Sequence, residues 1–314
     1  ESLDWSDGSD SSRYDMEDDG RFKAGVPVGT PRTRVTASSS KESCAASNST
    51  STAAASKRDY KSLRSGGSVL GNYHKNLSVT SHVTKYKRKH KKLINQYEIG
   101  KLLGEGAFAS VRKAFDIAAS RYCAVKKMAK SRLRKDLGSS NHSELTKVRA
   151  GLLAVYPLSH PHLLKIFEIM DSPKLDSLYI VLEFAGSGQI MSFDSSRKQY
   201  YSDLLGTGPL GGIKLTEVKR IMLEALSAIQ YMHSVKVTHG DIKPDNLLLD
   251  SQLNVKLSDF GSARSHDGEK EALVANGTYA FWSPEMAGAD GNSEPYSDDV
   301  WALSVTLYCM AFGD

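Results

Sequence analysis

Cysteine is scarce in this chain, which has only Cys44, Cys123 and Cys309 among its 314 residues. The three lie far apart and show no C-x-x-C or Cys/His spacing, so the sequence predicts neither a disulfide framework nor a zinc site. Few cysteines without such spacing are typical of proteins from a reducing compartment, and on that ground we expect a cytoplasmic location.

Long apolar runs are also missing from the sequence. The longest, residues 300–312, is shorter than the roughly 20 residues that a helix needs to cross a bilayer, so it predicts a buried core helix and no membrane span. A strong excess of one charge is missing as well, because the formal net charge is +5. Much of that excess lies at residues 85–92 without a nucleic-acid-reading motif, so nucleic acid is not predicted as a main partner.

Large apolar side chains are few near the N-terminus, where Ser, Thr, Gly and charged residues dominate. Such a composition cannot bury enough surface to offset chain entropy, so we predict a disordered tail over residues 1–94. Residues 37–56 suit phosphorylation, and an inert solvated tail is an equally weighted alternative. The basic run at residues 85–92 suits a nuclear-localisation signal, an acidic-lipid contact or a docking site for acidic partners, and a plain linker fits at least as well.

From residue 95 onward the pattern changes to regular secondary structure. Residues 97–103, 110–115, 122–128 and 178–184 have the apolar and β-branched character of strands. Apolar residues recur at helical spacing in residues 144–155 and 216–233, and Thr216 is the expected N-cap of the second helix. Strands first and helices later predict an α+β protein with two lobes.

A glycine-rich motif, G-E-G-A-F-A-S-V at residues 104–111, lies between two predicted strands. This position is typical of a hairpin that covers phosphates, since Gly104 and Gly106 would let backbone amides approach closely. The third small residue is Ala109, and an ordinary β-hairpin explains this motif alone equally well. Lys126 follows Val111 by fifteen residues and ends an apolar strand, where a lysine can reach the α- and β-phosphates.

The strongest signal is H-G-D-I-K-P-D-N at residues 239–246, followed after a short strand by D-F-G at residues 259–261. Phosphoryl transfer needs an acceptor for the hydroxyl proton, oxygen ligands for Mg²⁺ and cations near the phosphates. The residues for these three tasks are, respectively, Asp241, then Asn246 with Asp259, then Lys243 with Lys126. ATP and Mg²⁺ are therefore the expected cofactors.

On these motifs residues 97–314 resemble the eukaryotic protein kinases. Lys243, two residues after Asp241, is the pattern of serine/threonine kinases. The resemblance implies a β-rich N-lobe over residues 95–185 and part of a helix-rich C-lobe over residues 186–314. It also implies transfer of the ATP γ-phosphoryl group to Ser or Thr of protein substrates.

The same resemblance assigns further residues of the site. Thr278, near the end of the activation segment, would contact Asp241 and Lys243, and Asp299 would support the catalytic loop. The nucleotide would be contacted by Leu103, Gly104, Gly106, Val111, Ala124, Lys126, Leu182 as the gatekeeper, Glu183, Ala185 and Leu248.

Four short stretches, at residues 94–97, 128–134, 188–191 and 300–309, resemble the calcium/calmodulin-dependent protein kinase kinases and related kinases upstream of the AMP-activated kinase. This narrower resemblance implies a signalling role in which the substrate is another kinase. Calmodulin is a partner that it suggests, but any calmodulin-binding segment would be expected beyond residue 314.

Three features depart from the kinase pattern. Counting forward from Lys126 places its glutamate partner at Glu144, whereas counting back from residues 160–161 gives Gly151, two helical turns or about 10 Å away. We assign Glu144 and retain a pseudokinase or scaffold as the alternative function. Gly240 replaces the usual arginine, so the activation loop is expected to order without phosphorylation. The resemblance also implies further helices after Asp314 that would cover residues 300–312.

Overall fold

The secondary structure is known for residues 79–88, 90–106, 109–134, 143–267, 277–288 and 293–314, the parts of the chain that the computed structural model describes. The strands are β1 (Val79–Thr80), β2 (Lys85–Arg88), β3 (Lys91–Ile94), β4 (Tyr97–Glu105), β5 (Ala109–Asp116), β6 (Arg121–Ala129), β7 (Ile166–Asp171), β8 (Ser177–Glu183), β9 (Gly188–Gln189), β10 (Ser192–Asp194), β11 (Gln199–Tyr201), β12 (Val237–Thr238), β13 (Leu247–Leu249), β14 (Val255–Leu257) and β15 (Arg264–Ser265). The α-helices are α3 (Lys130–Leu133), α4 (Glu144–Val155), α5 (Leu215–Ser234), α6 (Pro284–Ala287) and α7 (Pro295–Phe312). Short 3₁₀ helices span Pro244–Asn246, Phe260–Ser262 and Tyr279–Phe281.

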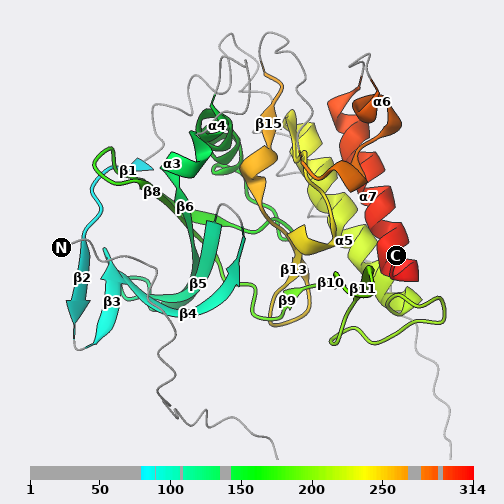
Figure 1. Cartoon of the computed structure of the whole chain (residues 1–314), viewed down its shortest axis with the longest axis horizontal. Coiled ribbons are helices and arrows are strands. Elements are labelled where there is room, and N and C mark those ends of the chain that lie inside the picture. Colours follow the sequence, from blue (N-terminus) through cyan, green and yellow to red (C-terminus); the bar gives the residue numbers. More distant parts are fainter. Residues whose placement is uncertain (1–78, 89, 107–108, 135–142, 268–276, 289–292) are drawn as a thin grey trace, which may run out of the picture. The chain divides into compact units, whose positions relative to one another are not determined.

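The N-lobe is built on an eight-stranded sheet in the order β1-β7-β8-β6-β5-β4-β3-β2, antiparallel except for the β1–β7 pair. Strands β6 and β8 are paired within its core, where Val125 and Val181 lie opposite each other and are fully buried. Strands β4, β5, β6 and β8 lie within two residues of the predicted segments. Figure 1 shows these strands beside α4.

Helix α4 has the predicted bounds. Leu145, Val148, Leu152 and Val155 recur every three or four residues and are all buried, which is the pattern of a helix with one packed face. The helix contacts α3, β15 and the 3₁₀ helix Phe260–Ser262. It therefore touches both the sheet side of the molecule and the segment that follows Asp259.

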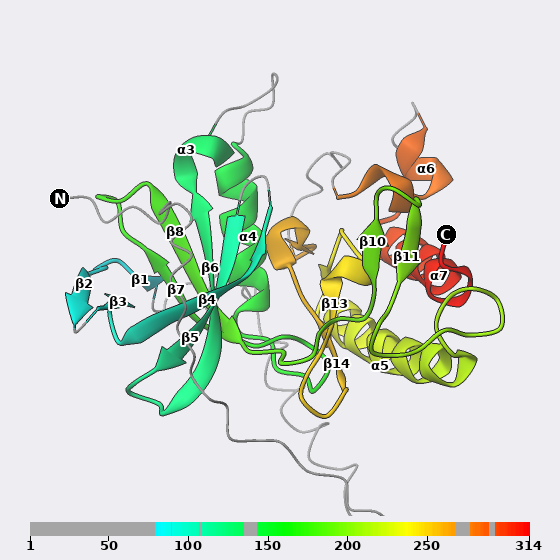
Figure 2. The same ribbon diagram turned by 60° about the horizontal axis from the view of Figure 1, so that its bottom comes forward.

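The second lobe combines α5 and α7 with the β13–β14 hairpin, and in Figure 2 α5 and α7 lie side by side. Ile221, Ala225 and Met232 form the buried face of α5. The helix begins at Leu215 with Lys214 as its N-cap residue, so the prediction of Thr216 as the cap is wrong by two residues. The two parts together confirm the α+β fold with two lobes.

The prediction of disorder is wrong for residues 79–88 and 90–94, while residues 1–78 lie outside the described part of the chain. Leu93 and Ile94 are 4% and 3% exposed, and β3 pairs with β4 along its length. Burial of these two side chains and the new ladder hydrogen bonds offset the chain entropy that composition alone suggested. The described basic residues of the run 85–92 thus lie on a β2–β3 hairpin at the sheet edge.

Helix α7 is buried on one side only. Leu303, Thr306 and Met310 are almost fully buried, whereas Trp301, Leu307 and Tyr308 on the other side are exposed. The prediction of a buried core helix over residues 300–312 is met for the first side alone. Within the described parts of the chain, none of the helices combines the length and apolar character that crossing a bilayer requires.

We expect the exposed side of α7 to cause self-association of this 314-residue chain, because contiguous exposed apolar side chains drive contacts between molecules. Replacing Leu307 and Tyr308 by Lys should shift light scattering toward the monomer and change the Tm by no more than about 2 °C, as surface substitutions usually do. Leu303→Lys is the matched control on the buried side and should instead unfold the second lobe. Unchanged scattering in the double variant would contradict the expectation.

Candidate active site

The catalytic loop follows β12 and leads into the 3₁₀ helix Pro244–Asn246. In this loop Asp241 Oδ1 accepts hydrogen bonds from Thr278 N (2.9 Å) and Thr278 Oγ1 (2.7 Å). Its Oδ2 accepts from Lys243 Nζ (2.9 Å) and Asn246 Nδ2 (3.1 Å). Lys243 Nζ also donates to Thr278 Oγ1 (2.7 Å), so the contacts expected of Thr278 with Asp241 and Lys243 are present.

Asp299, near the start of α7, accepts three hydrogen bonds, two of them from the backbone of this loop. Its Oδ2 accepts from the backbone N–H of His239 (2.8 Å) and from His233 Nε2 (2.8 Å), and its Oδ1 accepts from the N–H of Gly240 (2.8 Å). The Asp299 carboxylate is buried, so these charge-assisted bonds are the strong kind. The loop is therefore fixed by its backbone before any substrate binds.

The His239 ring fixes the start of the loop in a defined tautomer. Its Nδ1 accepts from Asp241 N (3.2 Å), which requires the proton to be on Nε2, and Nε2 donates to the carbonyl of Ser258 (2.9 Å). Ser258 precedes Asp259, so one neutral imidazole links the catalytic loop to the D-F-G segment.

The end of the activation segment lies directly on the catalytic loop. A Cβ atom at Gly277 would lie 2.3 Å from the carbonyl oxygen of Gly240, and Gly277 has a φ of +86°, which favours glycine. This close backbone approach places Thr278 within reach of Asp241. The activation-loop residues 268–276 lie outside the described part of the chain.

The two predicted metal ligands belong to different segments, Asn246 to the end of the catalytic loop and Asp259 to the D-F-G segment. Asn246 donates its amide N–H to Asp241 O (2.6 Å) and Oδ2, so its Oδ1 is the atom that a metal would meet. Asp259 adopts a left-handed backbone conformation (φ +61°) and its carboxylate is 43% exposed. A carboxylate and an amide oxygen are ligands that Mg²⁺ prefers, together with phosphates and water, so these residues fit that ion.

Lys126 is paired with Asp259 in this structure. The Nζ of Lys126 lies 2.7 Å from Asp259 Oδ1. The surrounding protein opposes ionisation of Asp259, but the Lys126 ammonium and its hydrogen bond outweigh this effect and hold the pKa of the carboxyl below its ordinary value. Asp259 is thus a carboxylate at neutral pH, as a metal ligand must be.

Strand register places the predicted nucleotide contacts of the N-lobe on one face. Val111 is paired directly with Lys126, and Ala124 with Leu182, and Ala124 and Lys126 are two residues apart on β6. Leu103, Gly104 and Gly106 are exposed at the edge of this face, and Ala185 follows β8. On β13 of the other lobe, Leu248 is half-buried while its neighbours are fully buried.

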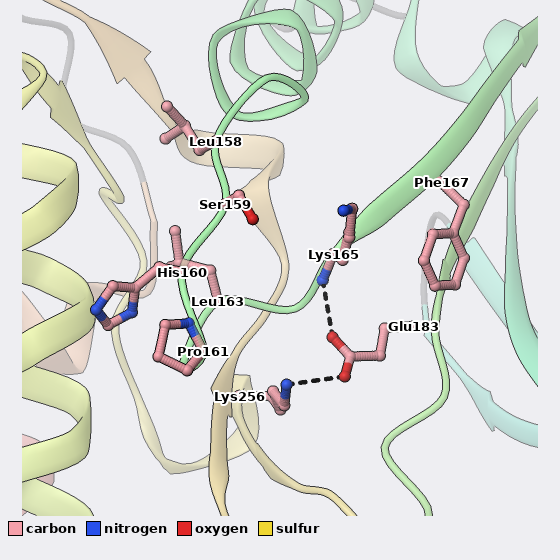
Figure 3. A pocket seen from close by; sticks show the side chains of 9 residues that line it. All are labelled: Leu158, Ser159, His160, Pro161, Leu163, Lys165, Phe167, Glu183 and Lys256. Carbon is pink, nitrogen blue, oxygen red and sulfur yellow. Dashed lines mark hydrogen bonds and ion pairs between the residues drawn. The ribbon is translucent and has the colours of Figure 1, made fainter. Parts of the chain in front are cut away.

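The Glu183 side chain does not face the nucleotide side. Its Oε1 pairs with Lys256 Nζ (2.8 Å) and its Oε2 accepts from Lys165 N (3.2 Å), as Figure 3 shows. Both partners line a separate pocket of about 360 Å³ that also includes His160 and Phe167. Any contribution of Glu183 to adenine binding is therefore made by its backbone.

The prediction that Glu144 pairs with Lys126 is wrong in this structure. Glu144 is the first residue of α4 and forms an ion pair with Lys147 (3.5 Å), whereas Lys126 pairs with Asp259. The part of α4 that approaches the D-F-G segment lies two turns later, at Gly151, whose Cβ would be 2.8 Å from Phe260 O. Counting back from residues 160–161 had pointed to this position.

Comparison with known proteins agrees with this site. Residues 97–314 match the family model described as "Protein kinase domain". The chain is 32% identical over 234 residues to serine/threonine-protein kinase ssp1 of Schizosaccharomyces pombe, covering 71% of this chain and 34% of that protein. It is 29% identical to serine/threonine-protein kinase TOS3 of Saccharomyces cerevisiae, covering 71% and 41%, and 28% identical to NUAK family SNF1-like kinase 1 of Homo sapiens, covering 72% and 31%.

The chain spans between about a third and two fifths of the length of these relatives. The family match nevertheless covers most of the chain, including Lys126, the catalytic loop and Asp259. This chain therefore belongs to the protein kinase family.

Proposed function

We propose that this chain carries the catalytic domain of a serine/threonine protein kinase that uses ATP and Mg²⁺. The observation that carries the proposal is the network joining Asp241, Lys243 and Thr278, with Asn246 bonded to Asp241. A substrate hydroxyl placed at Asp241 would lose its proton to that carboxylate. Lys243, held by both other residues, is positioned to offset the charge on the transferred phosphoryl group.

The remaining residues hold the nucleotide. Asp259 and Asn246 Oδ1 would bind Mg²⁺, which supplies charge neutralisation between the phosphates when it is bound. Lys126 lies beside Asp259 and would exchange this partner for the α- and β-phosphates as the nucleotide enters. The exposed end of β4 carries Gly104, where the absence of a side chain would let the backbone approach the phosphates closely.

A catalytically weak scaffold is the second candidate, and Gly151 is the observation that favours it. A kinase helix normally supplies a carboxylate to the lysine at the position of Lys126. Here Gly151 occupies the place where α4 meets the D-F-G segment. A nucleotide-binding protein with little transfer would show this feature too.

A transfer assay separates the two candidates. We expect the purified chain with labelled ATP, Mg²⁺ and a mixture of Ser, Thr and Tyr peptides to label Ser or Thr only, and to stop when EDTA removes the metal. Asp241→Asn provides the background control. Binding of Mg²⁺-ATP without transfer above that background would favour the scaffold.

For the substrate class, we propose another protein kinase. The support is the resemblance of four stretches of this sequence to kinases upstream of the AMP-activated kinase. A catalytically inactive SNF1-like kinase domain should be labelled on its activation loop, and its Thr→Ala variant at that site should not. Labelling of peptides but not of this domain would contradict the substrate proposal. Ca²⁺-loaded calmodulin, added to the same assay, tests the regulator that the resemblance suggests.

We also propose that the activation loop needs no phosphate to order its end. Gly240 stands where a phosphate-binding arginine is usual, and Gly277 and Thr278 already contact the catalytic loop through Gly240 and Asp241. Phosphatase treatment should therefore leave the transfer rate within about twofold, whereas a phosphate-dependent loop would lose most of it. For location we propose the cytoplasm, with the nucleus as the alternative that the basic residues 85–92 suggest.

A further inference from the structure

Helix α4 lies unusually close to the segment after Asp259. A Cβ atom built on Gly151 would lie 2.7 Å from the carbonyl oxygen of Ala263 and 2.8 Å from that of Phe260. Both neighbours are backbone atoms, so no side chain fits at this position unless the helix moves. The position of α4 thus supports the backbone on which Asp259 depends, but α4 sends no carboxylate to Lys126.

Besides the packing of its buried apolar face, α4 is linked to the sheet by an ion cluster of three residues. Arg149, two residues before Gly151, donates from Nε (2.7 Å) and Nη2 (2.6 Å) to Asp171 Oδ2. The other oxygen of Asp171 accepts from Lys130 Nζ at 3.0 Å. Lys130 also donates to the carbonyl of Ser172 at 2.7 Å.

Two members of this cluster are buried. Lys130 is 1% exposed and the Asp171 side chain is 12% exposed, whereas the Arg149 side chain is 41% exposed. Burial opposes ionisation of Asp171, but the hydrogen bonds and charges of Lys130 and Arg149 outweigh it and hold the pKa of Asp171 below its ordinary value. A buried carboxylate with two cationic partners costs much to leave unpaired, so the three side chains stay together.

The cluster connects the elements that matter for the site. Asp171 ends β7, Arg149 lies on α4, and Lys130 begins α3 directly after β6, four residues beyond Lys126. The strand that carries Lys126 is therefore tied to the helix that supports Phe260 and Ala263. Asp171 forms this link because it pairs with both Lys130 and Arg149.

We propose that Asp171 is a positioning residue for phosphoryl transfer. From the end of β7, Asp171 links α4 to the strand of Lys126, the link that a glutamate on the helix makes in other kinases. It does so away from the residues assigned to the nucleotide. The inference rests on the proposed kinase function, which its kinetic test requires. Its second test, by hydrogen exchange, needs only the folded chain. The side chain of Asp171 bonds Lys130 and Arg149, so it would act through the position of α4.

The kinetic test is a double-mutant cycle of Asp171→Asn and Gly151→Ala, measured on kcat. Each single variant should lower kcat by about 10- to 100-fold with a KM for ATP within about threefold, since small displacements of catalytic groups have such effects. Because both substitutions displace the same helix, the double variant should be little worse than either, a coupling of roughly tenfold or more. Arg149→Lys, which keeps the cation, should retain more activity than Arg149→Gln.

The control is Asp250→Asn. Asp250 is also a hydrogen-bonded carboxylate with a pKa held below its ordinary value by its partners in spite of desolvation, but it lies in the β13–β14 turn and bonds Gln252 and Asn254. If the effect of Asp171→Asn is only general destabilisation, Asp250→Asn at equal loss of Tm will lower kcat equally. That result would overturn the inference. So would a double variant of Asp171→Asn and Gly151→Ala whose loss of kcat equals the product of the two single losses.

A readout independent of activity keeps the inference separate from the proposed function. Hydrogen exchange of the Ala263 amide, which donates to Phe260 O (3.2 Å), should become about tenfold faster in Asp171→Asn and stay unchanged in Asp250→Asn. A wild-type chain without transfer activity would refute the kinase proposal while this measurement still decides the inference. Unchanged exchange in Asp171→Asn would refute the inference alone.

Discussion

Asp241→Asn is expected to lower kcat by about 10² to 10⁴ while the KM for ATP stays within about twofold, because a general base speeds proton transfer without holding the nucleotide. The asparagine keeps the size of the side chain and can still accept from Thr278 N, so the fold of the loop should survive. What it loses is the negative charge that Lys243 pairs with and that a substrate proton would need. Single-turnover kinetics on the purified variant check the chemical step directly.

The matched control for this prediction is Asp245→Asn. Asp245 lies four residues further on, in the 3₁₀ helix Pro244–Asn246 that follows the loop of Asp241, and contacts Tyr200 rather than the catalytic network. The same chemical change there should leave kcat within about twofold, as surface substitutions usually do. An Asp241 variant that transfers phosphate as fast as the wild type would show that another group accepts the proton.

Asp259→Asn is expected to weaken Mg²⁺-dependent nucleotide binding by more than about 100-fold. Loss of residues that only support a metal ligand costs 10- to 100-fold in metal affinity, and Asp259 would contact the ion itself. In EDTA no metal is bound, so the only effect of the substitution is the loss of the ion pair between Asp259 and Lys126. Binding of ATP in EDTA should therefore change much less than binding with Mg²⁺. Titration calorimetry with and without the metal measures both.

Asp241→Asn serves as the control here, since its Mg²⁺-ATP affinity should match the wild type. If Asp259→Asn binds Mg²⁺-ATP as tightly as the wild type, the metal is held elsewhere. In that case the pairing of Asp259 with Lys126 has only a structural role. The assignment of Asn246 and Asp259 as a pair of metal ligands is then wrong.

The catalytic residues were predictable because they lie close together in the sequence and form a recognisable motif. Asp241, Lys243 and Asn246 lie within six consecutive residues, so a single motif names all three. Strands such as β6 and the helix α4 were predictable for a similar reason, since burial follows the local period of apolar residues. Thr278 needed the family resemblance, because its contact with Asp241 spans 37 residues.

The features that sequence missed depend on distant partners. Asp171 is an ordinary acidic residue until the sheet and α4 bring Lys130 and Arg149 to it from positions 41 and 22 residues away. Sequence favours Glu144 over Gly151 because only Glu144 has a carboxylate, and spacing alone does not show that backbone packing at Gly151 leaves no room for one. Strand β3 is not predictable from sequence because Leu93 and Ile94 are only two apolar residues directly after the basic run 85–92, and their burial depends on β4.

The three hydrogen bonds to Asp299 also determine how this domain can open. One carboxylate near the start of α7 accepts from His233 on α5 and from two amides of the catalytic loop. Unwinding of α7 as far as Asp299 would leave all three donors without their acceptor in a buried place, which is costly. The helix start and the catalytic loop therefore belong to one cooperative unit, and the amides of His239 and Gly240 should exchange only when that unit opens as a whole.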